Sequence, residues 1–552
     1  MKYEMKNLLH CPSFYLVPIS WIGVLACFFK KVSIVLSGNL YESVALQWVI
    51  EPLVYYAIFY FVVLLVCATV YFDTYGKYDM QEAFDSISFK YAEKQQILCL
   101  FTVHIVLTIL MLAIAIGVNL FWIKGMRELS IQFFKNIVVN YGLAGILSIV
   151  VGKNLSNIPI AHVKLPFIAI LAFLLSPMRA ELTALLRTDF SFIEIFPENV
   201  NFSLNEYIGY PIQIQRVAII IFWIFINVLF VSFYFKDGIM IKGSCIALCV
   251  IALVGAVLPR TLLTNIGYYG TYYRTNSYYL RSDDQAVLAV KQKANFTVKK
   301  YNMEFIIRNQ LEAVVSMEIE QNERQNEYPF TLYHEYKIQK VYDQDGNTLK
   351  YKRKNDYILI YPTNNTSKIS IEYCGTGSPY YSESNGTYLT SGFPFFSFPG
   401  YSIVFDEVNG CFANLELEKE ADFDIRIKSS NKFYCNLLKE SENHFVGASK
   451  EIILLSGMVS EYTYGTIRFL YPSTFRQEIV EEQIEIFMER MSQEYEELLP
   501  TLENKTFVRR PLIFNAERGV GYDDLVICDL FTSDFLVSYY TSLFEAKGKG
   551  NE

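Results

Sequence analysis

Histidine and glutamate residues spaced as in a zinc site would be the clearest sign of catalytic chemistry in this sequence. The pattern HExxH on a helix places two imidazoles one turn apart on a metal ion, with the intervening Glu as general base. The chain has five histidines, and only His334-Glu335 begins this pattern. The pattern is incomplete there, because position 338 is Ile and not His. The surrounding residues alternate between apolar and polar, as in a strand. In a strand, two residues four positions apart do not lie one helical turn from each other, so they could not bind one metal ion as HExxH does. We therefore expect no zinc-dependent catalysis.

Nucleotide hydrolysis would need a P-loop, GxxxxGK[ST], whose backbone amides cradle phosphates while Lys and Ser/Thr hold phosphate and metal. The nearest approach is Gly145 followed by Gly152-Lys153-Asn154, where the spacing is wrong and the residues lie in an apolar stretch. The nucleophile pattern GxSxG is absent as well. The sequence thus indicates no enzyme and no cofactor, and any ATPase would be a separate chain.

Ionisable residues within apolar stretches are candidates for function by default. His104 lies in the middle of one such stretch, and His162 and Lys164 lie at the start of another. A lone His among apolar residues is more often packed and hydrogen-bonded than a proton carrier, and a Lys near a helix end can extend its ammonium to water. We assign none of the three a functional role.

The composition divides the chain into two unlike halves. Hydrophobic residues make up 52% of the 552 residues and charged residues only 19%, with a mean hydropathy of +0.23, whereas soluble domains are about a quarter charged. The first 260 residues are slightly basic and the remainder is acidic. An acidic second half excludes nucleic acid as its partner, because phosphate binding needs a basic surface.

The first half contains stretches long enough to cross a bilayer, which takes about 20 mainly apolar residues. Four are clear, namely residues 52–72, 97–123, 217–235 and 240–259. Three are weaker, residues 13–29, 136–152 and 157–176, interrupted by Pro18, Asn140 and Pro166. The sequence therefore predicts an α-helical polytopic membrane domain of about seven spans over residues 1–262, in the plasma membrane. The first stretch lacks a small-residue cleavage site, so we expect it to be retained.

A polar segment, residues 73–96, separates the second and third spans. Its apolar residues Met80, Phe84 and Ile87 recur at helical spacing with charges between them. A short amphipathic helix here could dock onto a partner protein. A solvated helix lying on the lipid surface explains the pattern equally well.

Residues 1–235 resemble the membrane subunit of a type-2 ABC exporter. In that family a short N-terminal segment precedes the first span, a cytoplasmic coupling helix lies between spans two and three, and a longer outer loop lies between spans five and six. Residues 177–215, including Arg187, Asp189, Pro197 and Tyr210, occupy the outer-loop position. The resemblance assigns ATPase coupling to Met80, Glu82, Phe84, Ile87 and Lys94. It also implies a cytoplasmic residue 1, an extracytoplasmic C-terminal half, a cytoplasmic ABC ATPase partner and a homo- or heterodimeric permease.

Residues 263–283 connect the halves and include a tyrosine-rich run, YYGTYYRTNSYYL, over residues 268–280. Tyrosine prefers the membrane interface, where its ring is partly buried and its hydroxyl stays wet. We expect an interfacial junction, with an aromatic ligand platform as the alternative.

Residues 284–472 consist of short alternating stretches typical of strands with one buried face. The stretches lie at residues 333–342, 349–354, 356–362, 367–373, 423–428 and 464–472. Asp345-Gly346 predicts a hairpin between the first two. We expect a mainly-β sandwich domain.

The last segment, residues 473–552, changes period and predicts a short α/β element. Five apolar residues recur at helical spacing, Val480, Ile484, Phe487, Met491 and Tyr495. A strand, a glycine turn and a second strand follow.

Residues 297–535 resemble the N-terminal β domain of the zinc aminopeptidase (gluzincin) family and the opening of its next domain. The resemblance rests on Tyr301-Asn-Met-Glu, the turn of residues 341–347, Tyr373-Cys-Gly375 and the aromatic run 393–401. The chain departs from the family in lacking HExxH and the substrate-binding GxMEN, for which Asn515-Ala-Glu-Arg-Gly519 is not an equivalent. The sequence also ends before the catalytic helix would begin. We therefore expect a non-catalytic aminopeptidase-like domain.

Two functional hypotheses follow from the sequence. The first is a permease subunit of an ABC transporter that exports an unknown substrate and carries an extracytoplasmic β domain. The alternative is a membrane-anchored sensor or immunity protein whose β domain binds peptide. A surviving fragment of a permease–peptidase fusion is a third possibility.

Overall fold

In the computed structural model the chain divides into two compact units. The first comprises residues 1–204 and 210–263, and the second comprises residues 205–209 and 264–552. The structure describes residues 2–36, 42–73, 88–122, 127–158, 160–175, 195–196, 207–209, 212, 214–236, 238–257, 278–279, 291–308, 310–320, 325–363, 366–375, 382–390, 393–406, 411–413, 415–473, 475, 477–511, 520–521, 524–529 and 531–549.

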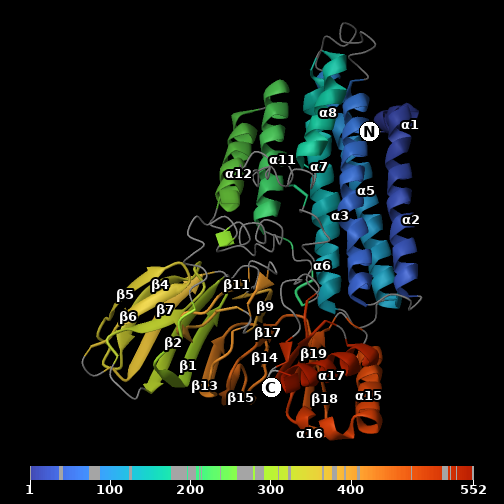
Figure 1. The fold of residues 1–552 in the computed structure, drawn as a ribbon. Helices are drawn as coiled ribbons and strands as arrows, with labels where there is room; N and C mark the ends of the chain where they lie inside the picture. Colours follow the sequence, from blue (N-terminus) through green and yellow to red (C-terminus); the bar gives the residue numbers. More distant parts are fainter. Residues whose placement is uncertain are drawn as a thin grey trace. The chain divides into compact units, whose positions relative to one another are not determined.

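The first unit is helical in all its main elements (Figure 1). Its helices are α1 (Lys2–His10), η1 (Pro12–Tyr15), α2 (Leu16–Leu36), α3 (Glu42–Phe72), α5 (Ser88–Trp122), α6 (Arg127–Ile137), η3 (Val138–Leu143), α7 (Ala144–Ser156), α8 (Ala161–Leu175), α11 (Ile214–Tyr234) and α12 (Ile239–Val257). α7 packs against both α3 and α11, and α11 packs against α12. Large apolar side chains such as Ile109, Ile170 and Ile251 are exposed on these helices, as expected for a surface that lipid covers.

Five helical stretches among the described residues are long and apolar enough to cross a membrane. They are Pro12–Lys30, Tyr91–Gly117, Ile131–Ser156, Ile214–Tyr234 and Ile239–Ala256. The predicted spans at 52–72 and 157–176 fall on shorter apolar stretches, Tyr56–Phe72 and His162–Leu175. The prediction of a multi-helix apolar half is therefore confirmed for five stretches.

The predicted interruption at Asn140 is not a break in the helix. The chain passes from α6 through a π-helical turn, η3, into α7 without leaving the helical path. Asn140 is buried and donates a hydrogen bond to Oδ1 of Asn136, one turn earlier, at 3.3 Å. The amide nitrogen of Asn140 thus finds its hydrogen-bond partner within the same helical path.

The second unit is dominated by β-sheets. The largest has seven strands in the order β15-β16-β13-β1-β2-β7-β4, and only the β1–β13 pair is parallel. Its strands are β1 (Thr297–Ile307), β2 (Leu311–Glu320), β4 (Lys337–Asp343), β7 (Lys368–Gly375), β13 (Ala421–Lys428), β15 (Leu438–Ser441) and β16 (His444–Ser449). Buried and exposed residues alternate along β13, as the sequence pattern predicts.

Three smaller sheets complete this β region. Their orders are β10-β3-β6-β5, β14-β17-β9-β8 and β11-β12. Their strands are β3 (Tyr328–Thr331), β5 (Lys350–Lys354), β6 (Tyr357–Tyr361), β8 (Ser382–Glu383), β9 (Gly386–Leu389), β10 (Phe398–Pro399), β11 (Phe405–Asp406), β12 (Cys411–Phe412), β14 (Phe433–Cys435) and β17 (Leu454–Ser456). One hydrophobic core includes Phe305 of β1, Ile358 of β6 and Leu454 of β17. The predicted mainly-β domain is therefore confirmed.

The turn at Asp345-Gly346 exists, but the strands on either side of it join different sheets. Gly346 has a φ of +81°, and its N–H donates to the carbonyl of Asp343 at 3.1 Å, so the predicted turn geometry is correct. β4 pairs with β7, whereas β5 pairs with β6. The prediction of a hairpin between these two strands is therefore wrong beyond the residues next to the turn. Cross-strand side-chain pairs, rather than the turn, decide which sheet each strand joins.

The C-terminal segment forms an α/β layer with its own core. Its sheet has the order β18-β19-β20-β22-β21, in which β19, β20 and β22 are parallel. The elements are β18 (Val459–Tyr464), β19 (Ile467–Pro472), α15 (Gln477–Glu494), η6 (Glu496–Leu498), α16 (Leu499–Leu502), β20 (Thr506–Arg509), β21 (Val520–Gly521), β22 (Leu525–Cys528) and α17 (Ser533–Lys549). Four of the five apolar positions predicted for the helix are buried in α15, and Tyr495 packs beside them.

A short segment from the predicted outer loop belongs to the second unit. Tyr207 is fully buried there and donates its hydroxyl to the carbonyl of Arg509 at 2.5 Å. The N–H of Met458 donates to the carbonyl of Tyr207 at 2.7 Å. Gly457, with φ +113°, lies so close that an added Cβ would be 2.4 Å from the Tyr207 carbonyl oxygen. Residues 207 and 278 thus both lie in the second unit, with α11 and α12 between them in the chain.

Candidate functional site

A buried ion pair joins α5 to α7 in the helical unit. Lys153 Nζ lies 2.6 Å from Glu93 Oε1, and the side chains are only 1% and 5% exposed. The same ammonium donates to Asn157 Oδ1 at 3.2 Å and lies 4.8 Å from the centroid of the Tyr234 ring. Removing two charges from water costs several kcal/mol for each ion, so such a pair persists only when it is well partnered. In an apolar helical unit such a pair is a candidate functional site.

A second ion pair joins the residue after α3 to α8. Lys164 Nζ lies 2.9 Å from Asp73 Oδ1 and donates to the carbonyl of Ser156 at 3.1 Å. The Lys164 side chain is 10% exposed. Lys164 therefore bonds to protein groups, in contrast to the expectation that its ammonium would extend to water.

The two ion pairs lie at opposite ends of the segment predicted to couple to an ATPase. Asp73 is the first residue of segment 73–96, and Glu93 lies near its end. The predicted coupling residues Met80, Glu82, Phe84 and Ile87 lie outside the described residues. Lys94 is exposed, with its ammonium 5.1 Å from the centroid of the Phe235 ring just after α11. Both flanks of the segment are thus bonded to other helices.

A polar contact continues from α7 to α11. The side-chain amide of Asn154 donates to Oδ1 of Asn227 at 2.9 Å and to its carbonyl at 3.1 Å. α7 therefore carries, within about one turn, polar bonds to both α5 and α11.

His104 is bonded at both ring nitrogens within the same unit. Nε2 lies 3.0 Å from the carbonyl of Gly142, and Nδ1 lies 3.0 Å from the hydroxyl of Tyr60. A carbonyl can only accept, so Nε2 carries the hydrogen and Nδ1 accepts from Tyr60. Gly145 packs on the ring, where an added Cβ would lie 2.1 Å from Cε1. The prediction of a packed, hydrogen-bonded histidine is confirmed.

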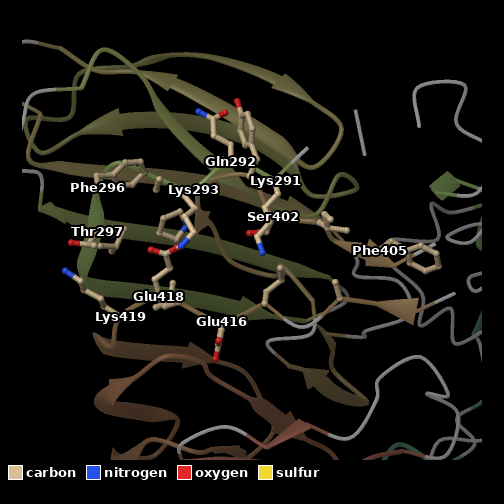
Figure 2. Close-up of a pocket in the computed structure, with 18 of the residues that line it drawn as sticks. Lys291, Gln292, Lys293, Phe296, Thr297, Ser402, Phe405, Glu416, Glu418 and Lys419 are labelled. Carbon is tan, nitrogen blue, oxygen red and sulfur yellow. The ribbon is translucent and has the colours of Figure 1, made fainter. Parts of the chain in front are cut away.

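The second unit contains a pocket of about 880 Å³ (Figure 2). It is lined by residues within segments 291–298, 399–406 and 413–419. Phe296, Leu415 and Leu417 supply buried apolar surface. Lys293 and Glu418 form an exposed ion pair at 2.8 Å, which contributes little to stability.

Extended backbone forms part of this pocket. Gln292 and Tyr401 exchange two backbone hydrogen bonds, at 2.9 and 2.8 Å. Burial alternates along residues 415–418 as in a strand. The pocket thus combines apolar and charged side chains with extended backbone, a surface on which a ligand can bind.

His334, the start of the incomplete zinc pattern, has a structural role in the second unit. Its ring stacks on Tyr278 with centroids 3.6 Å apart, and its Nδ1 lies 3.1 Å from Oδ1 of Asp356. Tyr279 donates its hydroxyl to Oδ2 of the same carboxylate at 3.0 Å. Burial and then Asp356 hold the pKa of Tyr279 well above its usual value, and the same causes raise the pKa of Tyr278 to about 12.

Tyr279 lies near the end of the predicted interfacial junction, residues 263–283. It is 1% exposed and belongs to the core of the second unit. The remaining tyrosines of the run lie outside the described residues. No group of three or more His, Cys, Asp or Glu residues in the described part of the chain is arranged to hold a metal ion.

No protein-family model matches this chain, and no curated protein matches it. Among solved structures it is similar to native leukotriene A4 hydrolase from Saccharomyces cerevisiae, with a TM-score of 0.30 and 11% identity over 46% of this chain and 44% of that one. It is also similar to the M1 zinc metallopeptidase from Deinococcus radiodurans, with a TM-score of 0.27 and 11% identity over 43% of this chain and 60% of that one. The chain thus spans less than two thirds of either. Structural similarity with TM-scores this low does not assign a function, so the function is argued from the residues of this chain.

Sequence reasoning missed the Lys153–Glu93 pair. Lys153 was considered only as part of a failed P-loop, and Glu93 only as one charge of a polar segment. A lysine within a predicted span is itself a signal for a buried partner, but the sequence does not say which acid that partner is.

Proposed function

We propose that this chain is the membrane-spanning permease subunit of an ABC exporter, with a non-catalytic, aminopeptidase-like β unit. A separate cytoplasmic ATPase would drive it, and two copies, or one copy with a partner permease, would form the path. The observation that carries the proposal is that segment 73–96 is held at both flanks by ion pairs, Asp73–Lys164 and Glu93–Lys153. A segment held in this way can pass the movement of a docked partner into the helices.

The contacts suggest the route of that movement. Force on segment 73–96 would reach α8 through Asp73–Lys164 and α7 through Glu93–Lys153. From α7 it would reach α11 through Asn154 and Asn227. Because buried polar pairs have a few discrete arrangements rather than a continuum, such a chain of contacts suits a two-state transporter.

The ion pairs of the helical unit support a bundle whose helices alternate in direction. The ion pairs gather the ends of α3 and α7 and the beginnings of α5 and α8, so successive helices alternate in direction. Among the described residues, α11 and α12 lie between residue 207 and residue 278, and both of these residues belong to the second unit. We propose seven spans, with the C-terminal unit outside the cytoplasm.

The first test is co-purification of the full chain from native membranes in mild detergent, followed by mass spectrometry of its partners. We expect a stoichiometric ABC ATPase whose hydrolysis rate rises in the complex. An otherwise intact complex that reproducibly lacks an ATPase would overturn the proposal.

A peptide-binding sensor is the second candidate, and the pocket of the β unit favours it. Apolar surface beside extended backbone is the arrangement that binds extended peptides. Peptides that bind the full chain with no ATPase partner present would support this alternative. Mutation of Leu415→Asp should then weaken peptide binding, and the exposed Glu482→Lys should leave it unchanged.

A further inference from the structure

Arg216, in the first turn of α11, is a buried cation, and no acid among the described residues neutralises it. Its side chain lies within the helical unit, and the residue is 3% exposed. Nε and Nη2 are buried and have no hydrogen-bond partner.

The other buried cations of this unit contrast with Arg216. Among the described residues, Lys153 is paired with Glu93 and Lys164 with Asp73, and no described acid is paired with Arg216. A guanidinium buried without a counter-ion is strongly unfavourable. A bound oxyanion would neutralise this charge.

The two unpartnered groups define the geometry of a ligand. Nε–H and the adjacent Nη2–H point in the same direction along one edge of the guanidinium, and this edge binds two oxygens of a carboxylate or phosphate side by side. Arg216 also lies in the first turn of a 21-residue helix, where the helix dipole has its positive end. Both features select an oxyanion.

The surroundings indicate what the oxyanion is attached to. Ile219 and Ile220 of the same helix are buried, and Val217 packs against the apolar core of the unit. Gln215 donates to the carbonyl of Ala256 at 2.8 Å and so holds this first turn against the end of α12. A fixed cation among apolar groups suits a phosphate that carries an apolar body.

We propose that the Nε–Nη2 edge of Arg216 is a binding site for one phosphate group, supplied either by an anionic phospholipid headgroup or by a soluble phosphate. This site is independent of the proposed transport function, because it rests on α11 and α12 alone.

The test compares wild type, Arg216→Met and Arg216→Lys as full chains in phosphatidylcholine nanodiscs. Melting temperatures are measured alone, with added phosphatidylglycerol in the disc, and with inorganic phosphate in the buffer. Without added anion we expect Arg216→Met to melt at or above wild type, because it removes an uncompensated charge. The control is Lys135→Met, which removes an exposed charge on α6. Its melting temperature should respond to the added anions as that of wild type does.

Phosphatidylglycerol should raise the melting temperature of wild type but not that of Arg216→Met. The rise for Arg216→Lys should be smaller than for wild type, because lysine lacks the paired N–H groups. The affinity lost in Arg216→Met should be about tenfold or more. A rise with phosphatidylglycerol alone identifies a lipid headgroup, and a rise with inorganic phosphate as well identifies a soluble source. If neither anion stabilises wild type more than Arg216→Met, the site does not exist.

Discussion

At the scale of single residues, the buried charges of the helical unit tie different helices together. Lys153 gives two hydrogen bonds, to Glu93 of α5 and to Asn157 just after its own helix, and adds an aromatic contact with Tyr234 of α11. The contact with Glu93 is short and shielded from water, so it should be costly to break.

Removing one partner of the ion pair should be worse than removing both. Glu93→Gln leaves the Lys153 charge buried without its acid and should destabilise the helical unit by about 3–5 kcal/mol. The double variant Glu93→Gln/Lys153→Met should be closer to wild type, because no charge is left. Thermal unfolding in detergent measures this, with Lys135→Met as an exposed control. Additive losses in the double variant would contradict the pairing.

Two glycine-to-alanine variants should have opposite effects. In Gly145→Ala the new Cβ would lie 2.1 Å from the His104 ring, which displaces the imidazole from Tyr60 and Gly142 and should cost about 2 kcal/mol or more. Gly117 of α5 has nothing within 4 Å of the added Cβ, so Gly117→Ala should be neutral or stabilising by about 0.5–1 kcal/mol. Melting temperatures of the two variants give the comparison, and equal effects would show that His104 is not held as described.

At the scale of elements, local patterns predicted most helices and strands, and long-range contacts accounted for the differences. α15 and β13 follow directly from their apolar spacing. The partner of β5 could not be read from its turn, because pairing depends on β6. Likewise nothing local to Tyr207 shows that it packs against Tyr388 and Arg509, far along the chain, and the Glu93–Lys153 contact depends on the packing of two helices.

Tyr207 should stabilise the β unit although it precedes α11 in the chain. Tyr207→Phe removes the bond to the Arg509 carbonyl and should cost about 1 kcal/mol. Tyr207→Ala also leaves a cavity and should cost about 3–5 kcal/mol. Limited proteolysis of the second unit in the full chain reports the loss, and Tyr91→Ala, an exposed tyrosine of α5, should have no such effect. An unchanged cleavage rate in Tyr207→Ala would contradict the assignment of this segment to the second unit.

The tyrosines at the junction should make the β unit sensitive to alkaline pH. The pKa of Tyr278 rises from 10.0 to about 12, so above pH 10 the unfolded chain loses this proton while the folded one keeps it. Stability is therefore fully present below about pH 10 and declines as the pH rises toward 12. Tyr278→Phe should flatten this decline in the unfolding free energy. An identical pH profile in the variant would mean that Tyr278 does not contribute.

At the scale of the whole molecule, two kinds of unit share one chain and divide the tasks between them. The helical unit holds its buried charges at the flanks of segment 73–96. The β unit contains a pocket lined by apolar and charged residues. Under the proposed function, coupling and substrate contact are thus separate, so a variant can abolish one and leave the other intact.

Charge reversal in segment 73–96 should uncouple the protein without unfolding it. Glu82 lies between the apolar residues Met80, Phe84 and Ile87 in sequence, on the polar side of the predicted amphipathic helix. Glu82→Lys therefore changes the surface presented to a partner and leaves the apolar side unchanged. We expect the purified variant to melt as wild type does, but to lose binding and stimulation of the ATPase. Glu482→Lys makes the same charge change at an exposed position of α15 and should retain both. If Glu82→Lys stimulates the ATPase fully, segment 73–96 does not couple the ATPase to the helices. If the variant instead melts at a lower temperature than wild type, the segment supports the fold.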